Sequence, residues 1–381
     1  MSPKKIILVA GARPNFMKIA PILRAFKKHS NLIPKLVHTG QHYDASMSGA
    51  FFDSLEIQKP DYNLEVGSGS HAVQTANIMV KFEEVCTLEK PDVVLVVGDV
   101  NSTIAAGLVA KKMEIGLAHV EAGLRSRDRA MPEEINRIAT DAISDLFFTT
   151  EEEGTRNLLA EGHAAVSIYF VGHVMIDNLF YQLTKLKEKG PSAQVMKIRN
   201  ALPEKYLCMT MHRPSNVDDK KILGKLLSAI EKIAENAPVV FPCHPRTKKQ
   251  ISAFSLESYF SLLHNNEAKI NRGIVLLEPL DYNDFLYLWK DAAAVLTDSG
   301  GLQEETTALQ IPCITMRENT ERPVTAEIGS NVIVGTDPNK IEKYGKNALS
   351  GIWKKSYVPD LWDGKASERV AEVLAHEAII S

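Results

Sequence analysis

The chain has 381 residues, a length that favours two domains over three at about 150 residues per domain. Its composition is 45% hydrophobic and 24% charged, which excludes an intrinsically disordered chain. The 44 basic and 47 acidic residues give a net charge of −3, so we expect neither nucleic acid nor an anionic membrane surface as the main partner.

The apolar runs of the sequence have the length of strands, as in 6–10 and 93–97, and none reaches the roughly 20 residues that span a membrane. Residues 1–5 lead directly into an expected strand and lack the features of a signal peptide. The cysteines are isolated and match no zinc-binding or redox spacing. We therefore expect a cytoplasmic protein with reduced thiols and no metal site. The four cysteines are Cys86, Cys208, Cys243 and Cys313.

In the first half of the chain, β-rich runs alternate with helical patterns. Helices are expected after the break at 11–14, with a kink at Pro21, and over 101–113. A helix that begins at Pro132 is expected to bury Ile135, Ile138 and Ala142, and Thr150 with Glu153 suggests a capping box. This order predicts a parallel sheet with helices on both faces. The expected strands are 5–10, 36–39, 93–97 and 117–120.

The β pattern disappears within 183–203, where lysines cluster, and a second alternation then begins. We predict an α/β protein with two Rossmann-like, doubly wound domains that face a central cleft. Residues 1–185 would form the first domain and 186–360 the second. A C-terminal helix within 361–381 could pack back onto the first domain. The expected strands of the second half are 207–211, 239–241, 275–277 and 295–297.

Nearly every expected strand ends in a cluster of polar residues. In an open α/β fold the carboxyl ends of the strands border the ligand crevice, so such clusters mark one site. One polar residue there could be an ordinary loop or cap, but seven clusters at equivalent places are hard to explain in that way. The clusters are Gly11–Arg13, Gly40–His42, Gly98–Asp99, His119–Gly123, His212–Arg213, His244–Arg246 and Asp298–Gly301.

The turn Ser299-Gly300-Gly301 joins an expected strand to an expected helix. Two glycines let backbone amides approach a phosphate, and the helix start adds partial positive charge, although a tight turn alone needs the same glycines. Glu304 and Glu305 could accept hydrogen bonds from ribose hydroxyls. Neither GxGxxG nor GxxxxGK[ST] is present, so no nicotinamide cofactor and no P-loop is supported. Cations that could neutralise a diphosphate, or be ordinary surface charges, are Arg13, Lys18, Arg213 and Arg322.

A group of carboxylates also falls at the ends of expected elements. Asp99 and Glu121 each follow an apolar strand, and Glu133 and Glu134 begin a helix. Asp99 could be a helix cap, and the two adjacent glutamates could simply suit the helix dipole. Gathered in one crevice, however, such carboxylates can serve as acid and base at a single carbon.

Two histidines follow strands in the second half of the chain. His212 and His244 could be ordinary loop residues, but their shared position favours a role beside phosphate groups. No HxH or HExxH spacing supports a metal site. Phe285 could stack on a flat base, although a core aromatic is the default interpretation.

Together these motifs resemble those of the non-hydrolysing UDP-N-acetylglucosamine 2-epimerases, nearly from end to end. The motifs are Gly11–Pro14, Thr39–His42, Gly98–Asp99, His119–Arg125, Pro132–Arg137, Asp298–Glu305 and Thr320–Pro323. The resemblance implies a fold similar to the GT-B glycosyltransferases, with a UDP-sugar between two Rossmann domains. It implies reversible C2 epimerisation of UDP-N-acetylglucosamine to UDP-N-acetylmannosamine, by anti elimination of UDP to a glycal and re-addition, without cofactor or metal.

By motif, the resemblance assigns catalysis to Asp99, Glu121, Glu133 and His212. Leu280 would act through its backbone near the uracil. The UDP-sugar is the expected partner, and a homodimer is the expected assembly. The residues expected to bind the UDP-sugar are Arg13, Lys18, Arg137, His244, Leu280, Phe285, Ser299, Gly300, Gly301, Glu305 and Arg322.

The sequence departs from many bacterial members at a second, regulatory UDP-sugar site. Those members continue the Gln-His pair with Arg and an amide residue, and carry an arginine after the next loop. Here Gln41-His42 is followed by Tyr43-Asp44, and 67–70 contains no arginine. We therefore expect hyperbolic kinetics without activation by a second substrate molecule.

Other functions are compatible with parts of the pattern. Ala12 and Asn15 leave room for a modified sugar, so a 2-epimerase of a UDP-2,3-diacetamido-uronic acid is the alternative enzyme. A retaining glycosyltransferase of the same fold would not need the three carboxylates. A UDP-sugar sensor would not need them or His212.

Overall fold

The computed structural model describes residues 2–41, 52, 55–261 and 269–377, and His42, Tyr43 and Asp44 lie outside this part of the chain. The chain divides into two compact units. Unit 1 comprises 1–178 and 360–381, and unit 2 comprises 179–359. The division falls inside helix α7 (Val174–Lys189), the helix in which the sequence places the first boundary, at 185.

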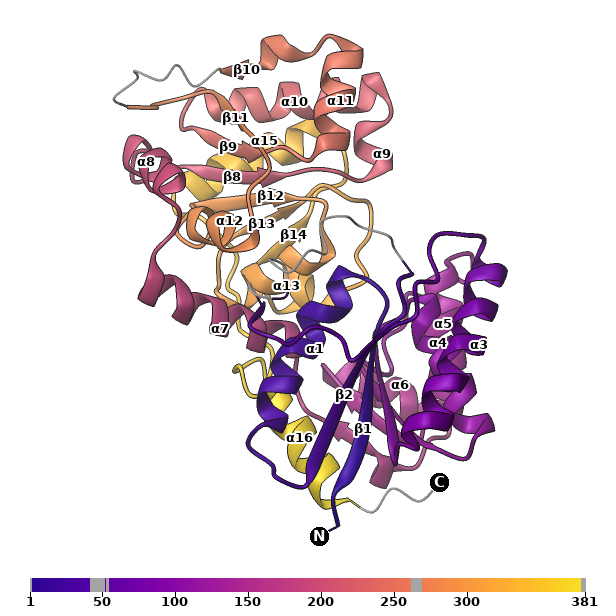
Figure 1. Ribbon diagram of the computed structural model, residues 1–381. Helices are drawn as coiled ribbons and strands as arrows, with labels where there is room; N and C mark the ends of the chain where they lie inside the picture. The colour runs from indigo at the N-terminus through magenta and orange to yellow at the C-terminus, as the bar shows by residue number, and fades with distance from the viewer. Residues whose placement is uncertain (1, 42–51, 53–54, 262–268, 378–381) are drawn as a thin grey trace. The chain divides into compact units, whose positions relative to one another are not determined.

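Unit 1 is built on a parallel sheet of seven strands in the order β3-β2-β1-β4-β5-β6-β7 (Figure 1). The strands are β1 (Lys4–Ala10), β2 (Leu32–His38), β3 (Tyr62–Asn63), β4 (Val93–Val97), β5 (Gly116–Val120), β6 (Leu146–Thr149) and β7 (Ile168–Phe170). Helices described in this unit, besides the start of α7, are α1 (Arg13–Phe26), α3 (His71–Glu89), α4 (Asn101–Lys112), α5 (Pro132–Ile143), α6 (Glu152–Ala160) and α16 (Ala366–His376), with a 3₁₀ turn at Ala165–Ser167.

The central strand β1 is covered on both faces, because its side chains alternate between two apolar clusters. Ile6 and Leu8 pack in the cluster that includes α1 and α16. Ile7 and Val9 pack in the cluster that includes α3 and α4, on the opposite face of the sheet (Figure 1). A strand buried in this way reads as a continuous apolar run, which is why the sequence predicts it.

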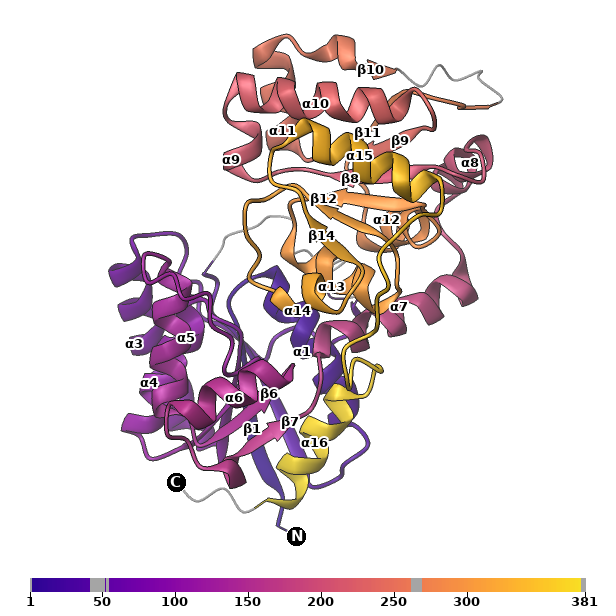
Figure 2. The same cartoon turned by 180° about the vertical axis from the view of Figure 1, so that it is seen from behind.

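Unit 2 repeats this plan with a parallel seven-stranded sheet in the order β10-β11-β9-β8-β12-β13-β14. Helices α10 and α15 lie side by side on one of its faces (Figure 2). Its strands are β8 (Leu207–Thr210), β9 (Val239–Pro242), β10 (Phe260–Ser261), β11 (Ile274–Leu277), β12 (Ala294–Thr297), β13 (Cys313–Thr315) and β14 (Asn331–Ile333). Its helices, after the end of α7, include α8 (Ala193–Ala201), α9 (Pro214–Val217), α10 (Lys220–Ala234), α11 (Pro245–Phe254), α12 (Tyr282–Trp289), α13 (Gly300–Ala308), α14 (Pro323–Glu327) and α15 (Pro338–Leu349), with a 3₁₀ turn at Glu257–Tyr259.

The predicted fold class, α/β with two Rossmann-like doubly wound domains, is confirmed. The strand order reverses between β1 and β4 in unit 1, and between β8 and β12 in unit 2, where the first strand of each unit lies inside its sheet. Ligands of open α/β sheets bind beyond the carboxyl ends of the strands at such a reversal. The strands that border the two reversals are followed by Gly11–Arg13, Gly98–Asp99, His212–Arg213 and Asp298–Gly301.

One prediction about helix α5 is wrong. Ile135 is 45% exposed, Ile138 is half-buried and Ala142 is exposed. The buried residues of this helix are polar: Glu134, Arg137, Thr140 and Asp141. The hydrophobic pattern fails here because ion pairs, described below, compensate the burial of the three charged groups.

The expected capping box of Thr150 and Glu153 is also absent. Helix α6 begins at Glu152, and its N-cap is Glu151, with no side-chain cap hydrogen bond. Thr150 is instead buried, and its carbonyl oxygen accepts a hydrogen bond from the indole of Trp362, at 3.0 Å.

The segment after residue 359 completes unit 1. Both carboxylate oxygens of Asp177 accept hydrogen bonds from the first turn of α16, from the backbone N–H groups of Ala366 and Ser367. The helix then packs on α1 through buried residues such as Val370 and Leu374. The Trp362 contact with Thr150 ties the segment to the end of β6.

A close backbone approach near the end of β5 requires glycine. Gly123 has a φ of +78°, and a Cβ atom there would lie 2.2 Å from the carbonyl oxygen of Gly154. Gly67, also in unit 1, has a φ of +74°, but no described atom lies within 4 Å of its Cβ position. The two glycines therefore share their backbone conformation and differ in the space around them.

Alanine at these two positions separates backbone strain from the steric contact. We expect Gly67→Ala to lower the free energy of unfolding by about 1–2 kcal/mol through strain alone, and Gly123→Ala to lower it by about 2–5 kcal/mol. Urea denaturation of both variants measures the difference. Equal losses would contradict the close contact between Gly123 and Gly154.

Candidate active site

Asp99 follows β4 in unit 1 and is held by two side chains of helix α5. The Arg137 guanidinium donates to its carboxylate at 2.6 Å, and the Asn136 amide donates to its backbone carbonyl at 2.9 Å. Arg137 is only 4% exposed, and its other terminal nitrogen donates to Glu134 at 2.8 Å. Asp99 thus lies at the edge of the unit with its carboxylate fixed by a buried cation.

Glu134 anchors the loop that precedes α5. Its carboxylate accepts hydrogen bonds from the backbone N–H groups of Ser126 and Arg127 at 2.8 and 3.0 Å. Burial opposes ionisation of this carboxyl, but these hydrogen bonds and Arg137 outweigh burial, so its pKa lies below the usual value. Glu133, beside it in the first turn of α5, is half-buried.

Glu121 follows β5, the strand that pairs with β4. Its carboxylate is 2.5 Å from the ammonium group of Lys18, which comes from α1. Its backbone has a φ of +69°, in the left-handed region that a residue with a side chain rarely adopts. Such strained residues cluster at functional sites. Arg13, at the first position of α1, is exposed.

Glycine at position 98 makes room for this ion pair. Gly98 has a φ of +70°, and a Cβ atom there would lie 3.2 Å from Nζ of Lys18 and 3.5 Å from a carboxylate oxygen of Glu121. The turn after β4 is also tied to α1, because the Asn15 amide donates to the carbonyl oxygen of Val97 at 3.1 Å. The ends of β4 and β5 and the start of α1 therefore bring Asp99, Glu121 and Lys18 to one edge of unit 1.

A buried ion-pair network lies behind these carboxylates. Nδ1 of His119 is 2.7 Å from Oδ1 of Asp141, and its Nε2 is 2.9 Å from the carbonyl oxygen of Gly98. Asp141 also accepts hydrogen bonds from the Gly123 backbone N–H and forms an ion pair with Arg125. Burial opposes ionisation of Asp141, but its contacts with His119 and Arg125 outweigh burial, so its pKa is lowered.

In unit 2 the corresponding centre is Asp298, a fully buried carboxylate that follows β12. It accepts hydrogen bonds from the backbone N–H groups of His212 and Arg213 and from the Asn216 amide. Its Oδ1 lies 3.2 Å from Nδ1 of His212. Burial opposes ionisation, but these contacts outweigh burial and lower the pKa of Asp298. One carboxylate thus joins the loop after β8 to the loop after β12.

The two predicted site histidines of unit 2 lie near each other. The ring centroids of His212 and His244 are 5.9 Å apart. Burial, and then the charges of His212 and Arg246, lower the pKa of His244. The His244 ring also caps helix α11, since it accepts a hydrogen bond from the Arg246 backbone N–H.

The glycines at the start of α13 lie beside open space. Neither Gly300 nor Gly301 has a positive φ, and no described atom lies within 4 Å of a Cβ atom built at either position. The fold of unit 2 therefore does not itself require glycine there. Ser299 is the N-cap of α13 and makes no side-chain cap hydrogen bond. A helix start with this free volume suits a phosphate group.

The acidic pair on α13 has partners within unit 2. Glu304 forms an ion pair with Arg322, and Glu305 accepts a hydrogen bond of 2.5 Å from the hydroxyl of Tyr282. Burial and the Glu305 charge raise the pKa of Tyr282 well above its usual value. Leu280 lies in the loop before α12, and Phe285 lies on α12, each half-buried.

A family model described as UDP-N-acetylglucosamine 2-epimerase matches residues 24–375. The chain belongs to the UDP-N-acetylglucosamine 2-epimerase family. A relative of that name from Methanocaldococcus jannaschii is 41% identical over 374 residues, which cover 98% of this chain and 99% of the relative. A UDP-2,3-diacetamido-2,3-dideoxy-D-glucuronate 2-epimerase from Pseudomonas aeruginosa is 38% identical, over 97% of this chain and 99% of the relative.

Solved structures match the fold of this epimerase closely. The crystal structure of the M. jannaschii UDP-GlcNAc 2-epimerase in complex with UDP-GlcNAc and UDP has a TM-score of 0.81 and 41% identity, over 98% of this chain and 100% of that chain. A lipopolysaccharide outer core galactosyltransferase has a TM-score of 0.51 at 16% identity, over 97% of this chain and 96% of that chain. The second match supports the GT-B-like fold class alone.

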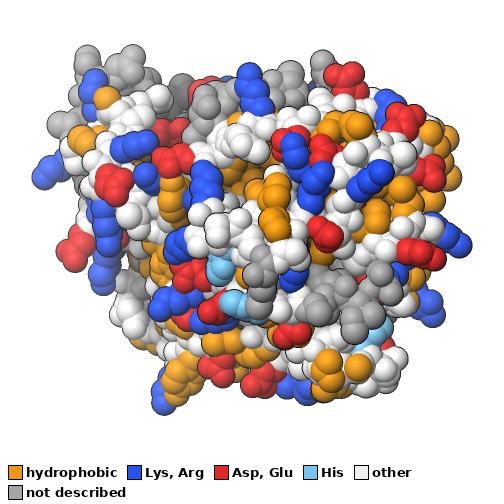
Figure 3. Space-filling model, turned by 60° about the horizontal axis from the view of Figure 1, so that its bottom comes forward, with side chains coloured by type: hydrophobic (Ala, Val, Ile, Leu, Met, Phe, Trp, Pro, Cys, Tyr) orange, Lys and Arg blue, Asp and Glu red, His pale blue; other side chains and the backbone are white. Residues whose placement is uncertain are grey.

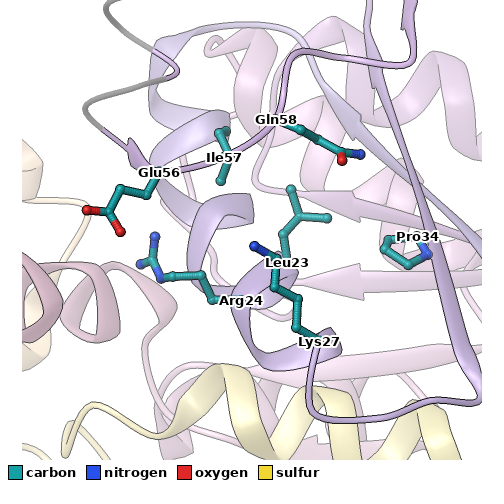
Figure 4. Close-up of a pocket in the computed structure, with 7 residues that line it drawn as sticks. All are labelled: Leu23, Arg24, Lys27, Pro34, Glu56, Ile57 and Gln58. Carbon is teal, nitrogen blue, oxygen red and sulfur yellow. The ribbon is translucent and has the colours of Figure 1, made fainter.

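One pocket and three buried cysteines of this epimerase lie outside the set of predicted site residues. The pocket in Figure 4 lies in unit 1, and none of the predicted site residues lines it. Burial raises the pKa of the Cys86 and Cys243 thiols to about 12 and that of Cys313 to about 11, so they hold little thiolate at neutral pH. The pocket is lined by Leu23, Arg24, Lys27, Pro34, Glu56, Ile57 and Gln58.

The surface charge and the helices of the epimerase give no sign of a metal site or a membrane span within the described residues. On the face shown in Figure 3, basic and acidic side chains are intermingled. Among residues 2–41, 52, 55–261 and 269–377, no three His, Cys, Asp or Glu side chains group so as to hold a metal ion. Over the same ranges, every helix is too short or too polar to span a lipid bilayer.

Three buried carboxylates hold the predicted site residues: Asp141 and Glu134 in unit 1, and Asp298 in unit 2. The sequence predicts Glu134 only as one of the carboxylates gathered for acid and base work, and predicts no role for Asp141 or for the side chain of Asp298. A signal for two of them was present, because Glu134, Arg137 and Asp141 follow one another at helical spacing and so share a face of α5. Asp298 lies in the polar cluster that follows an expected strand, and this position was its only signal.

The pH dependence of unfolding tests the buried charge of Asp298. Because its pKa is lowered in the folded protein, its contribution to stability is complete above the unfolded-state pKa of about 4 and is lost as the pH falls toward the folded-state value. We expect Asp298→Asn to lower the free energy of unfolding by about 1–3 kcal/mol at neutral pH.

The difference between this variant and the wild type should shrink below about pH 4. Asp219→Asn is the control, because Asp219 is an exposed N-cap and asparagine caps a helix equally well. Urea denaturation across the acidic range gives the comparison. A difference that persists unchanged at the most acidic pH would show that Asp298 is not a buried anion.

Proposed function

We propose that this epimerase interconverts UDP-N-acetylglucosamine and UDP-N-acetylmannosamine by inverting C2 of the sugar. The observation that carries the proposal is the pair of carboxylates at the ends of adjacent strands, Asp99 after β4 and Glu121 after β5, each fixed by a cation. The name of the M. jannaschii relative and the UDP-GlcNAc in its crystal structure support this substrate.

The reaction begins with departure of the leaving group. The C2 proton lies next to no carbonyl and is difficult to remove directly. As the bond between C1 and the diphosphate oxygen breaks, UDP leaves with the electron pair, and positive charge at C1 and the ring oxygen acidifies C2–H. A carboxylate then takes the C2 proton, and the anti elimination gives a glycal with a C1–C2 double bond.

Re-addition completes the inversion. A diphosphate oxygen of UDP attacks C1. At the same time a carboxylic acid delivers a proton to C2, on the face opposite to the one from which the first proton was removed. Two faces of one carbon require more than one acid/base group, and Asp99, Glu121 and Glu133 are the candidates. Lys18 and Arg137 hold Glu121 and Asp99 in place, so we assign Arg137 a role through Asp99.

Unit 2 would bind the nucleotide. The start of α13 with its open glycines suits the diphosphate, and His212 with His244 would lie beside it. Arg322 would add charge to the diphosphate site, Phe285 would face the uracil ring, and Glu305 would accept from the ribose hydroxyls. A phosphate contact of Arg13, which lies in unit 1, stays a prediction from the sequence.

The second candidate substrate is a UDP-2,3-diacetamido-uronic acid, because the P. aeruginosa relative with that name is 38% identical. Both reactions share the chemistry at C2, so the same carboxylates would serve. The sugars differ at C3 and C6, where a carboxylated sugar calls for an additional cation. The homodimer and the cytoplasmic location stay predictions from the sequence.

Solvent deuterium tests both the substrate and the mechanism. We expect NMR of reactions in D2O with a panel of UDP-sugars to show inversion at C2 for UDP-N-acetylglucosamine, with deuterium at C2 of the product. Prolonged incubation should also label the recovered substrate, because carboxylates exchange protons with solvent. Inversion without deuterium at C2 would exclude proton transfer, and turnover of the diacetamido-uronate alone would select the second candidate.

Amide variants test the individual carboxylates. We expect Asp99→Asn, Glu121→Gln and Glu133→Gln each to lower kcat by about 10²–10⁴-fold, because each keeps the shape of the side chain and removes proton transfer. Binding of UDP, measured by titration calorimetry, should largely survive. Glu83→Gln is the control, since Glu83 is exposed on α3. Near-normal turnover in all three variants would refute the assignment.

A further inference from the structure

His119 is a fully buried histidine in β5, two residues before Glu121, and the proposed chemistry gives it no role. Its Nδ1 is 2.7 Å from Oδ1 of Asp141, and its Nε2 is 2.9 Å from the carbonyl oxygen of Gly98. A carbonyl oxygen and an ionised carboxylate only accept hydrogen bonds. A neutral imidazole has one donor and one acceptor nitrogen, so the ring satisfies both contacts only with a proton on each nitrogen.

The charges around the ring agree with a cationic imidazolium. Asp141 forms an ion pair with Arg125, which in turn pairs with Glu161. A protonated His119 therefore makes a chain of two cations and two anions, whereas a neutral ring would leave one anion in excess. A buried charge is tolerated when it is paired and hydrogen-bonded in this way.

The Gly98 contact links this network to the proposed site. Gly98 also donates its backbone N–H to the carbonyl oxygen of Val120 at 3.1 Å. Its turn is thus joined to β5 through both of its backbone polar groups, once by the main chain and once by the His119 ring. Asp99 directly follows Gly98 in the chain. Glu121 follows the end of β5, two residues after His119.

We propose that His119 is a positioning residue: a buried imidazolium that clamps the Gly98 turn onto β5 and so holds Asp99 in register with Glu121. This inference rests on the proposed function, in which those carboxylates act on one carbon. It differs from a packing role, because a packing role would require the ring only to fill space. The clamp requires a donor directed at the Gly98 carbonyl.

Two amide substitutions at position 119 test the two hydrogen bonds of the ring separately, because each keeps one donor and removes the other. The amide of asparagine lies where Nδ1 does, so His119→Asn keeps a donor for Asp141 and loses the one for Gly98. The longer glutamine reaches the place of Nε2, so His119→Gln keeps a donor for Gly98 and loses the one for Asp141. Both variants remove the ring and its charge, which makes each a control for the other.

We expect His119→Asn to lower kcat by about 10–100-fold, the loss typical of a misplaced catalytic group, while His119→Gln retains most of the wild-type kcat. The KM of the substrate and the affinity for UDP should change little in either variant. Equal losses of kcat in both variants, in proportion to their losses of thermal stability, would overturn the clamp.

A measurement on the wild type keeps the inference testable if a variant fails to fold. In ¹⁵N NMR of histidine-labelled protein at neutral pH, His119 should show two protonated ring nitrogens, both protected from exchange with solvent. A neutral ring would overturn the proposal. The two tests are independent. If the wild type inverts none of the UDP-sugars, the proposed function fails, and the NMR spectrum still shows whether the His119 ring has a proton to donate to the Gly98 carbonyl.

Discussion

A carboxylate buried at the end of a parallel sheet must be surrounded by donors, because an unpaired buried charge costs several kcal/mol. This constraint organises the functional edge of both units. In unit 1, Asp141 and Glu134 gather His119, Arg125 and Arg137 around the ends of β4 and β5. In unit 2, Asp298 gathers the loops after β8 and β12. The groups proposed for chemistry are carried on these fixed loops.

The two units meet the constraint by different means. Asp298 is held by the His212 ring, two backbone N–H groups and an amide, and no arginine or lysine side chain is among its described partners. The buried carboxylates of unit 1 combine backbone N–H groups with buried arginines, and one of these, Arg137, also reaches the half-buried carboxylate of Asp99. Unit 1 thus holds the carboxylates proposed for acid/base chemistry against mutual repulsion, while unit 2 leaves open space beside the glycines of α13, where we propose that the diphosphate binds.

The sequence was sufficient for the fold class because strands covered on both faces, such as β1, β4 and β8, read as largely apolar runs. It also predicted that Asp99, Glu121 and His212 follow the carboxyl ends of strands, and the structure places them there. It failed for α5, whose buried face is polar. The periodicity of apolar residues cannot reveal a helix face whose buried side chains are charged and paired. The partners of these side chains come from β5 and from the loops after β4 and β5.

Unit 2 is inserted into unit 1, since the segment 360–381 returns to complete the first unit. This has a consequence for biosynthesis. Unit 2 is complete in sequence while unit 1 still lacks α16, the helix that covers α1, and the Trp362 contact at the end of β6. Domains generally fold as units during synthesis. The nascent chain therefore carries an unfinished unit 1 until the ribosome has added 360–381, and chaperones would find its apolar α1 surface uncovered during that interval.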